Sequence, residues 1–178
     1  MKRIYLVRHC ETVSQDPESP LTENGYKQTE ALAYFFKDKK IDTIRSSPFR
    51  RARESIEPLA QQRNIEVIED ERLAERVLSS INLPDWYEKL QETFINKELR
   101  FTGGESSQEA MNRIVNVIEE ISMSNDEDVI VVTHGNILAL LLHYYDHTFG
   151  FKNWEELRNP DVFELEIGYE AQVRNVWN

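Results

Sequence analysis

Four basic side chains of types that bind and transfer phosphate follow predicted strands, namely Arg8, His9, Arg51 and His134. The strands are predicted at residues 4–7, 41–45 and 128–133, which are short apolar runs bounded by polar residues. Arginine's planar guanidinium matches the oxygens of a phosphate, and a neutral imidazole can attack phosphorus. The carboxyl ends of parallel strands meet at one edge of a sheet, so we expect these four side chains to converge. The pattern predicts phosphoryl transfer with His9 as the nucleophile.

An acidic side chain is also required, because a leaving alkoxide needs a proton. Glu75 lies just beyond a third predicted strand, at residues 65–68, and is the carboxyl group best placed to donate that proton. It would then take a proton from the water that hydrolyses the phosphohistidine. Glu105 is the next candidate, and the segment before Glu75 holds three further acids, Glu69, Asp70 and Glu71. Spacing alone leaves these alternatives open.

The elements that must position these groups alternate along the chain. Apolar side chains at helical spacing predict helices at 27–38, 49–63, 106–121 and 137–145. Pro58 should kink or split the second of these helices, because it removes a backbone donor. Alternating strands and helices predict an α/β fold with a mostly parallel sheet and helices on both faces. Residues 76–102 show no regular pattern, and we expect either a lid or a surface helix there. Residues 162–177 are predicted to form a hairpin at the edge of the sheet.

Composition bounds the class of protein. A chain of 178 residues, 40% of them hydrophobic, fits a single domain. The net charge of −11 disfavours nucleic acid and anionic membranes as partners. Cys10 is the only cysteine, which favours the reducing cytoplasm, and no apolar run is long enough for a signal peptide or a membrane span. The composition leaves the oligomeric state open.

Six short motifs in this order resemble those of the histidine phosphatase superfamily, which also contains the cofactor-dependent phosphoglycerate mutases. They are the R-H-x-E-T run at 8–12, the L-T-x-x-G-x-x-Q run at 21–28, S-S-P-x-x-R-A at 46–52, L-x-E at 73–75, G-E-S at 104–106 and V-T-H-G at 132–135. The resemblance implies a three-layer α/β/α sandwich and a phosphohistidine formed on His9. It also implies that Glu75 is the proton donor. We expect the phosphate to be bound by Arg8, Arg51, His134, Gly135 and Thr12.

Three departures from the family pattern are visible. Cys10 stands where the family has glycine, which could narrow the pocket or restrict the backbone to negative φ. Gln15 stands where the mutases often have asparagine. The W-E-G element that often follows the proton donor is replaced by residues 76–80. The leaving-group side of the pocket is therefore expected to differ from the family pattern.

The favoured function is a phosphomonoesterase of the histidine acid phosphatase type that needs no metal or other cofactor. One alternative is a phosphoglycerate mutase, although the resemblance implies that such mutases are longer, with insertions that enclose a bisphosphorylated intermediate. Another alternative is a non-catalytic module that binds phosphorylated ligands. His143 and His147 could form a metal pair, but we expect a packing or surface role for them. The expected substrate is a small phosphorylated metabolite or a phosphoprotein.

Overall fold

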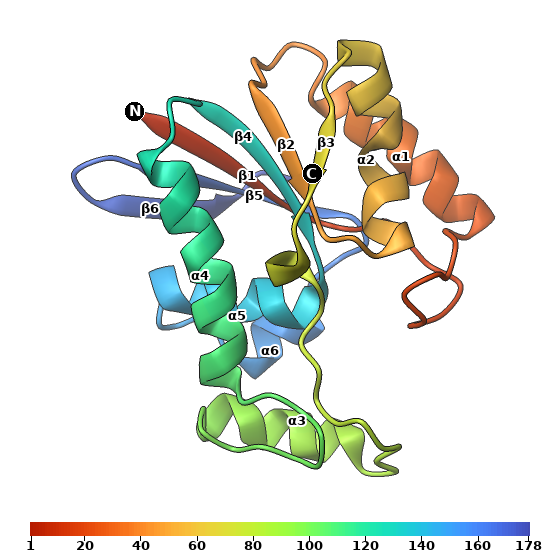
Figure 1. Cartoon of the computed structure of the whole chain (residues 1–178), viewed down its shortest axis with the longest axis vertical. Helices are drawn as coiled ribbons and strands as arrows, with labels where there is room; N and C mark the ends of the chain where they lie inside the picture. Colours follow the sequence, from red (N-terminus) through yellow and green to blue (C-terminus); the bar gives the residue numbers. More distant parts are fainter.

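The computed structural model describes residues 1–178 and contains one sheet of six strands in the order β3-β2-β4-β1-β5-β6 (Figure 1). The strands are β1 (Lys2–Arg8), β2 (Thr43–Ser46), β3 (Val67–Glu69), β4 (Asp128–Thr133), β5 (Asp161–Ile167) and β6 (Ala171–Asn175). The first four run parallel to one another, and β5 and β6 pair antiparallel at one edge. The predicted mostly parallel sheet and terminal hairpin are confirmed.

Helices cover both faces of this sheet. The helices of the molecule are α1 (Glu23–Phe35), α2 (Arg50–Arg63), α3 (Trp86–Ile95), α4 (Ser107–Met123), α5 (Gly135–Tyr145) and α6 (Phe151–Glu155), with a short 3-10 turn η1 (Glu71–Leu73). Figure 1 shows α1 and α2 on one face of the sheet and α4 and α5 on the other. Local capping starts two of these helices, because the Thr22 hydroxyl accepts from the amide of Gly25 and Ser106 forms a capping box with Glu109. The three-layer α/β/α arrangement is confirmed.

Two separate hydrophobic clusters, one on each face, hold the layers together. Alternating side chains of β1 divide between them, since Ile4 and Leu6 join the cluster under α4 and α5 while Tyr5 and Val7 join the cluster under α1 and α2. All six residues of β4 are buried, as expected for a central strand with helices on both faces. The two central strands, β1 and β4, are thereby fixed in place, and the candidate site lies at their carboxyl ends.

The expected split at Pro58 is wrong, because α2 runs without interruption from Arg50 to Arg63, while the alternative of a kink stays a prediction. Proline removes one backbone donor but does not prevent a helix from continuing when tertiary contacts hold both sides. Ile56 and Leu59, on either side of Pro58, are buried in the cluster beneath α1 and α2. Packing therefore compensates for the missing hydrogen bond.

The segment 76–102 contains α3, which lies at the opposite end of the molecule from α1 and α2 (Figure 1). Its aromatic side chains pack on α6, where the ring of Phe151 lies 5.3 Å from that of Tyr87 and 5.6 Å from that of Phe94. These contacts account for two of the four aromatic residues of this segment. The role of the segment as a lid stays a prediction.

Candidate active site

The nucleophile candidate lies at the end of β1, beside the end of β4. Arg8 is paired with Thr133 in the parallel register, and the amide of His9 donates to the carbonyl of Thr133 at 3.1 Å. His134 follows Thr133 directly, so its ring lies 5.0 Å from that of His9. Adjacent parallel strands thus bring together two histidines that are far apart in the sequence.

Hydrogen bonds select one tautomer of His9. Its Nδ1 lies 2.7 Å from the carbonyl oxygen of Cys10, and a carbonyl can only accept, so Nδ1 carries the hydrogen. The other ring nitrogen, Nε2, is then unprotonated, and Arg51 Nε donates to it at 3.3 Å. The lone pair of Nε2 is therefore the one that can attack phosphorus, once the hydrogen bond from Arg51 is released.

The surroundings also keep His9 neutral. Burial lowers its pKa from 6.5 to about 3, and the charges of Arg51 and Arg8 act in the same direction, while the hydrogen bond to Cys10 opposes them. Burial likewise lowers the pKa of His134 well below its ordinary value, with His9 and both arginines contributing. Both imidazoles are consequently uncharged at neutral pH, which is the form that a nucleophilic nitrogen needs.

Arg51, the second residue of α2, is almost completely buried, with 1% of its surface exposed. Its Nη1 donates to the carbonyls of Gln15 and Asp16, each at 3.2 Å. Arg8 Nη1 donates to the carbonyl of Leu157 at 2.7 Å, while its Nε is buried without a partner. Because these partners are carbonyls or an imidazole rather than carboxylates, the positive charges remain available to an anionic ligand.

Gly135 lies directly against Arg8. A Cβ atom at Gly135 would lie 3.0 Å from three atoms of the Arg8 guanidinium, closer than most ordinary contacts. The guanidinium therefore packs closely on the first turn of α5, and a larger residue there would have to push it aside by a few tenths of an ångström. The expected contact of Gly135 with phosphate stays a prediction, but this residue has a clear steric role in placing Arg8.

Three buried polar atoms of the molecule have no hydrogen-bond partner, and all belong to this region: Arg8 Nε, His134 Nδ1 and Asn136 Oδ1. Buried polar atoms are normally paired, so such a group marks a place where a ligand or water completes the bonding. His134 Nε2 is already engaged, since it lies 2.7 Å from the hydroxyl of Ser47. The unpaired set is consistent with an anion site that includes Arg8 and His134.

Glu75 lies on the loop that follows η1, and this loop brings it beside the start of α5. Its carboxylate accepts from the amide of Asn136 at 3.0 Å, that of Ile137 at 2.9 Å and that of Arg76 at 2.7 Å. The amides of Asn136 and Ile137 are therefore occupied by this carboxylate. Glu75 is thereby brought next to Gly135, the residue on which the Arg8 guanidinium packs.

Glu105, the other candidate acid, has a different set of partners. Both of its carboxylate oxygens accept from the guanidinium of Arg113 at 2.9 Å, and Oε2 also accepts from the amide of Val77 at 2.9 Å. This carboxylate is therefore committed to an ion pair on α4. Of the two, Glu75 is the one next to the residues that surround His9.

The surroundings of Thr12 and Cys10, two residues near the nucleophile, show what these side chains do in the fold. The hydroxyl of Thr12 bonds within its own loop, to the carbonyls of Ser14 and Pro20, each at 3.1 Å. Thr12 supports that loop, and its predicted phosphate contact stays a prediction. Cys10 is buried and its φ angle is not positive, while burial raises the pKa of its thiol to about 12. Cys10 is thus a packing residue, and its backbone has no need of glycine.

Sequence reasoning missed several supporting residues. The side-chain amide of Asn159 donates to the carbonyl of His9 at 2.9 Å, and Ser55 on α2 accepts from the amide of Cys10 at 2.8 Å. Ser47, which contacts His134, lies within the S-S-P motif and could have been suspected from it. Asn159 gave no such signal, because its loop meets β1 only through the antiparallel pairing of β5.

The other histidines lie apart from this site. His143 Nδ1 is within 2.8 Å of the Phe149 carbonyl, and its ring lies 5.5 Å from that of His147. The structure holds no group of three or more histidine, cysteine or acidic side chains arranged to hold a metal ion. A surface hollow of about 450 Å³ beside α2 and β3 is lined mainly by glutamates and arginines and includes none of the site residues. None of the helices combines the length and the apolar character that crossing a bilayer would require.

Comparisons with known proteins agree with this arrangement. The model of the histidine phosphatase superfamily, branch 1, matches residues 4–178. Phosphoserine phosphatase 1 of Hydrogenobacter thermophilus is 30% identical over 75% of this chain and 71% of its own length. The probable phosphoglycerate mutase GpmB of Escherichia coli is 30% identical over 99% of this chain and 90% of its own length.

Solved structures show the same fold. The mycobacterial glucosyl-3-phosphoglycerate phosphatase in complex with inorganic phosphate has a TM-score of 0.79, with 24% identity, over 100% of this chain and 97% of that one. Because the family model matches nearly the whole chain, the chain belongs to the histidine phosphatase superfamily, and the predicted family and fold class are confirmed.

The contact between Gly135 and Arg8 gives a direct test of the anion site. Gly135→Ala should displace the Arg8 guanidinium and weaken the binding of inorganic phosphate, measured by calorimetry, by roughly 10- to 100-fold, as expected for one charged hydrogen-bonding group. Gly168→Ala is the matched control, because a Cβ there meets nothing within 4 Å. Equal phosphate affinity in the two variants would contradict the placement of Arg8.

The low pKa of His9 predicts a pH-dependent stability. The folded pKa is about 3 and the unfolded value 6.5, so between these values the unfolded chain binds more protons. Stability present above pH 6.5 is therefore lost as the pH falls, by up to about 1.4 kcal/mol per pH unit for such a group. Denaturant unfolding from pH 6.5 to 4.5 should show a smaller loss in His9→Gln than in the original chain. The exposed His147 supplies the control variant, His147→Gln, and an unchanged slope in His9→Gln would refute the assignment.

Proposed function

We propose that this chain hydrolyses small phosphomonoesters through a phosphohistidine on His9, without a metal ion. The observation that carries the proposal is the state of His9, whose unprotonated Nε2 lies beside Arg51 Nε in a buried site. Buried polar atoms of Arg8 and His134 without partners support the binding of a phosphoryl group there. Membership of the superfamily and the phosphatases among the relatives support hydrolysis as the reaction.

In the first step, His9 Nε2 forms a bond to phosphorus while the bond from phosphorus to the alcohol oxygen breaks. Arg8, Arg51 and His134 stabilise the charge on the oxygens of the transferring group. The departing oxygen takes a proton from Glu75. We assign this proton to Oε2, because Oε1 already accepts from two amides whereas Oε2 accepts from one.

In the second step, the Glu75 carboxylate removes a proton from water as the water oxygen attacks phosphorus. The bond between phosphorus and Nε2 breaks, and its electron pair returns to the imidazole. Inorganic phosphate leaves, and His9 is neutral again with its hydrogen on Nδ1. The carbonyl of Cys10 accepts from Nδ1 throughout, which stabilises the positive ring of the intermediate.

For the substrate we propose a small phosphorylated metabolite. Relatives are named as acting on phosphoserine and on glucosyl-3-phosphoglycerate, both of which carry phosphate on a small molecule.

We place the enzyme in the cytoplasm, because the single cysteine is a buried free thiol. Phosphoglycerate mutation is a second candidate, because GpmB, named as a probable mutase, matches almost the whole chain.

The covalent intermediate provides the first test. A phosphoramidate is labile in acid and stable in base, so brief reaction with a ³²P-labelled substrate followed by an alkaline quench should leave label on the peptide that contains His9. The reaction is run in excess chelator, and label and turnover should both persist. His9→Ala should abolish both, whereas Cys10→Gly should retain the label. Label on another residue, or turnover that survives His9→Ala, would contradict the proposal.

Product analysis separates the two candidate reactions. Incubation with 3-phosphoglycerate and a trace of 2,3-bisphosphoglycerate should release inorganic phosphate if the chain is a phosphatase that accepts this acid. Accumulation of 2-phosphoglycerate without phosphate release would establish the mutase instead. Binding without any turnover, across a panel of phosphomonoesters, would favour the non-catalytic module.

The role of Glu75 is tested by the leaving group. Glu75→Gln cannot donate the proton that a poor alkoxide requires, but nitrophenolate departs without one. We expect kcat/KM to fall by about 100-fold or more for an alkyl phosphate and by less than about 10-fold for p-nitrophenyl phosphate. A uniform loss on both substrates would assign the proton to another group.

A further inference from the structure

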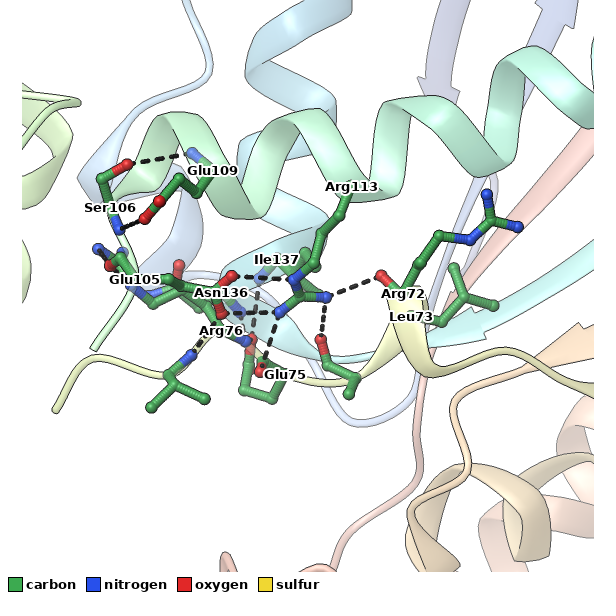
Figure 2. A network of polar contacts seen from close by, with 12 residues as sticks. Arg72, Leu73, Glu75, Arg76, Glu105, Ser106, Glu109, Arg113, Asn136 and Ile137 are labelled. Carbon is green, nitrogen blue, oxygen red and sulfur yellow. Dashed lines mark hydrogen bonds and ion pairs between the residues drawn. The ribbon is translucent and has the colours of Figure 1, made fainter. Parts of the chain in front are cut away.

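Arg113, on α4, lies outside the set of residues that surround His9, yet it contacts the loop that carries Glu75 (Figure 2). We propose that Arg113 and Glu105 form a positioning pair that holds this loop so that the Glu75 carboxyl group faces the leaving group. The inference rests on the proposed function, because it gives the pair a purpose only if Glu75 is the proton donor. Neither residue touches the reacting atoms.

The guanidinium of Arg113 binds the backbone on the amino-terminal side of Glu75 and at Glu75 itself. Nη1 donates to the carbonyl of Arg72 at 2.7 Å and to that of Ala74 at 2.8 Å, and Nη2 donates to the carbonyl of Glu75 at 3.2 Å. One side chain of α4 therefore binds three backbone carbonyls within residues 72–75. A lysine could not match these contacts, because it lacks the fixed fork of donors.

Glu105 holds the same loop on the carboxyl-terminal side. Its Oε2 accepts from the amide of Val77, while its backbone carbonyl accepts from Nη2 of the buried Arg76 at 2.9 Å. The same carboxylate holds Arg113 through both oxygens. Burial raises the pKa of Glu105, but the hydrogen bonds from Arg113 and Val77 outweigh it, so the pKa is lowered and the carboxylate stays ionised.

The loop is thus fixed before and at Glu75 by Arg113 of α4 and after it by Glu105, which precedes α4, while the carboxylate of Glu75 is fixed by the amides of Asn136 and Ile137 in the first turn of α5 (Figure 2). A proton donor must lie within hydrogen-bond reach of the leaving oxygen, and displacement by about 1 Å can cost on the order of 100-fold in rate. Arg113 and Glu105 hold the backbone around Glu75, while α5 holds its carboxylate. Loss of the pair should therefore resemble loss of the donor rather than loss of phosphate binding.

A matched control lies on the same two elements. The side chain of Arg72 also pairs with a glutamate of α4, Glu120, and donates to it from both Nη atoms at 2.7 and 2.9 Å. Its other partner is Asp70, so its side chain makes no bond to residues 73–77. Arg72→Lys disturbs a comparable ion pair between η1 and α4 without releasing Glu75.

The experiment compares kcat/KM for an alkyl phosphate and for p-nitrophenyl phosphate in the original chain, Arg113→Lys, Glu105→Gln, Arg72→Lys and Glu75→Gln. We expect Arg113→Lys and Glu105→Gln to lose about 10- to 100-fold on the alkyl phosphate and less than about 3-fold on p-nitrophenyl phosphate. Arg72→Lys should change the ratio between the two substrates by less than about 2-fold. Adding Arg113→Lys to Glu75→Gln should not alter that ratio further, because both changes act through one proton transfer.

The outcomes are distinct. If the original chain hydrolyses neither ester, the proposed function fails and the pair has no donor to position. If Glu75→Gln slows both esters equally, hydrolysis through His9 can stand but the positioning role is overturned. If Glu75→Gln is selective and the two pair variants slow both esters equally, or neither, the role is again overturned. Glu105→Gln keeps the shape of its side chain, so it supplies the answer if Arg113→Lys does not fold.

Discussion

The candidate site depends on the parallel pairing of β4 with β1 on one side and with β2 on the other. The ladder continues one residue past the ends of β1 and β2, since the amide of His9 donates to Thr133 and that of Ser47 to Val132. His134 directly follows Thr133, the last residue of β4. A register shift of one residue would turn alternate side chains to the opposite face and separate the two histidines. Burial of every residue of β4 between two hydrophobic clusters makes such a shift costly.

Burial at this edge of the sheet has two electrostatic consequences. It favours the neutral form of both imidazoles, which a nucleophilic nitrogen requires. It also desolvates Arg8 and Arg51, whose hydrogen bonds go to carbonyls and to His9. Guanidiniums without a carboxylate partner attract a dianion more strongly than paired ones would. The same burial that prepares the site for phosphate therefore makes the fold sensitive to acid.

The leaving-group side of the site is assembled from different elements. Glu75 comes from the loop after η1, its carboxylate is bound by the first turn of α5, and its backbone is bound by Arg113 from α4. Of the residues that replace the W-E-G element, Arg76 and Val77 take part: their amides donate to Glu75 and Glu105, and the guanidinium of Arg76 donates to the carbonyl of Glu105. The chain thus holds its proposed donor largely through hydrogen bonds to the backbone.

The sequence by itself predicted the α/β fold and the family and pointed to the four basic residues, because strand ends and short motifs are local patterns. It left Glu75 and Glu105 open as the acid on spacing alone, and it could not show which partners each carboxylate has. Nor could it show that Asn159 binds the carbonyl of His9, or that α2 continues through Pro58. The contact of Arg51 with the ring of His9 and the close packing of Arg8 on Gly135 likewise come from other elements. These features belong to the tertiary structure because each is a contact between segments that only the folded sheet brings together.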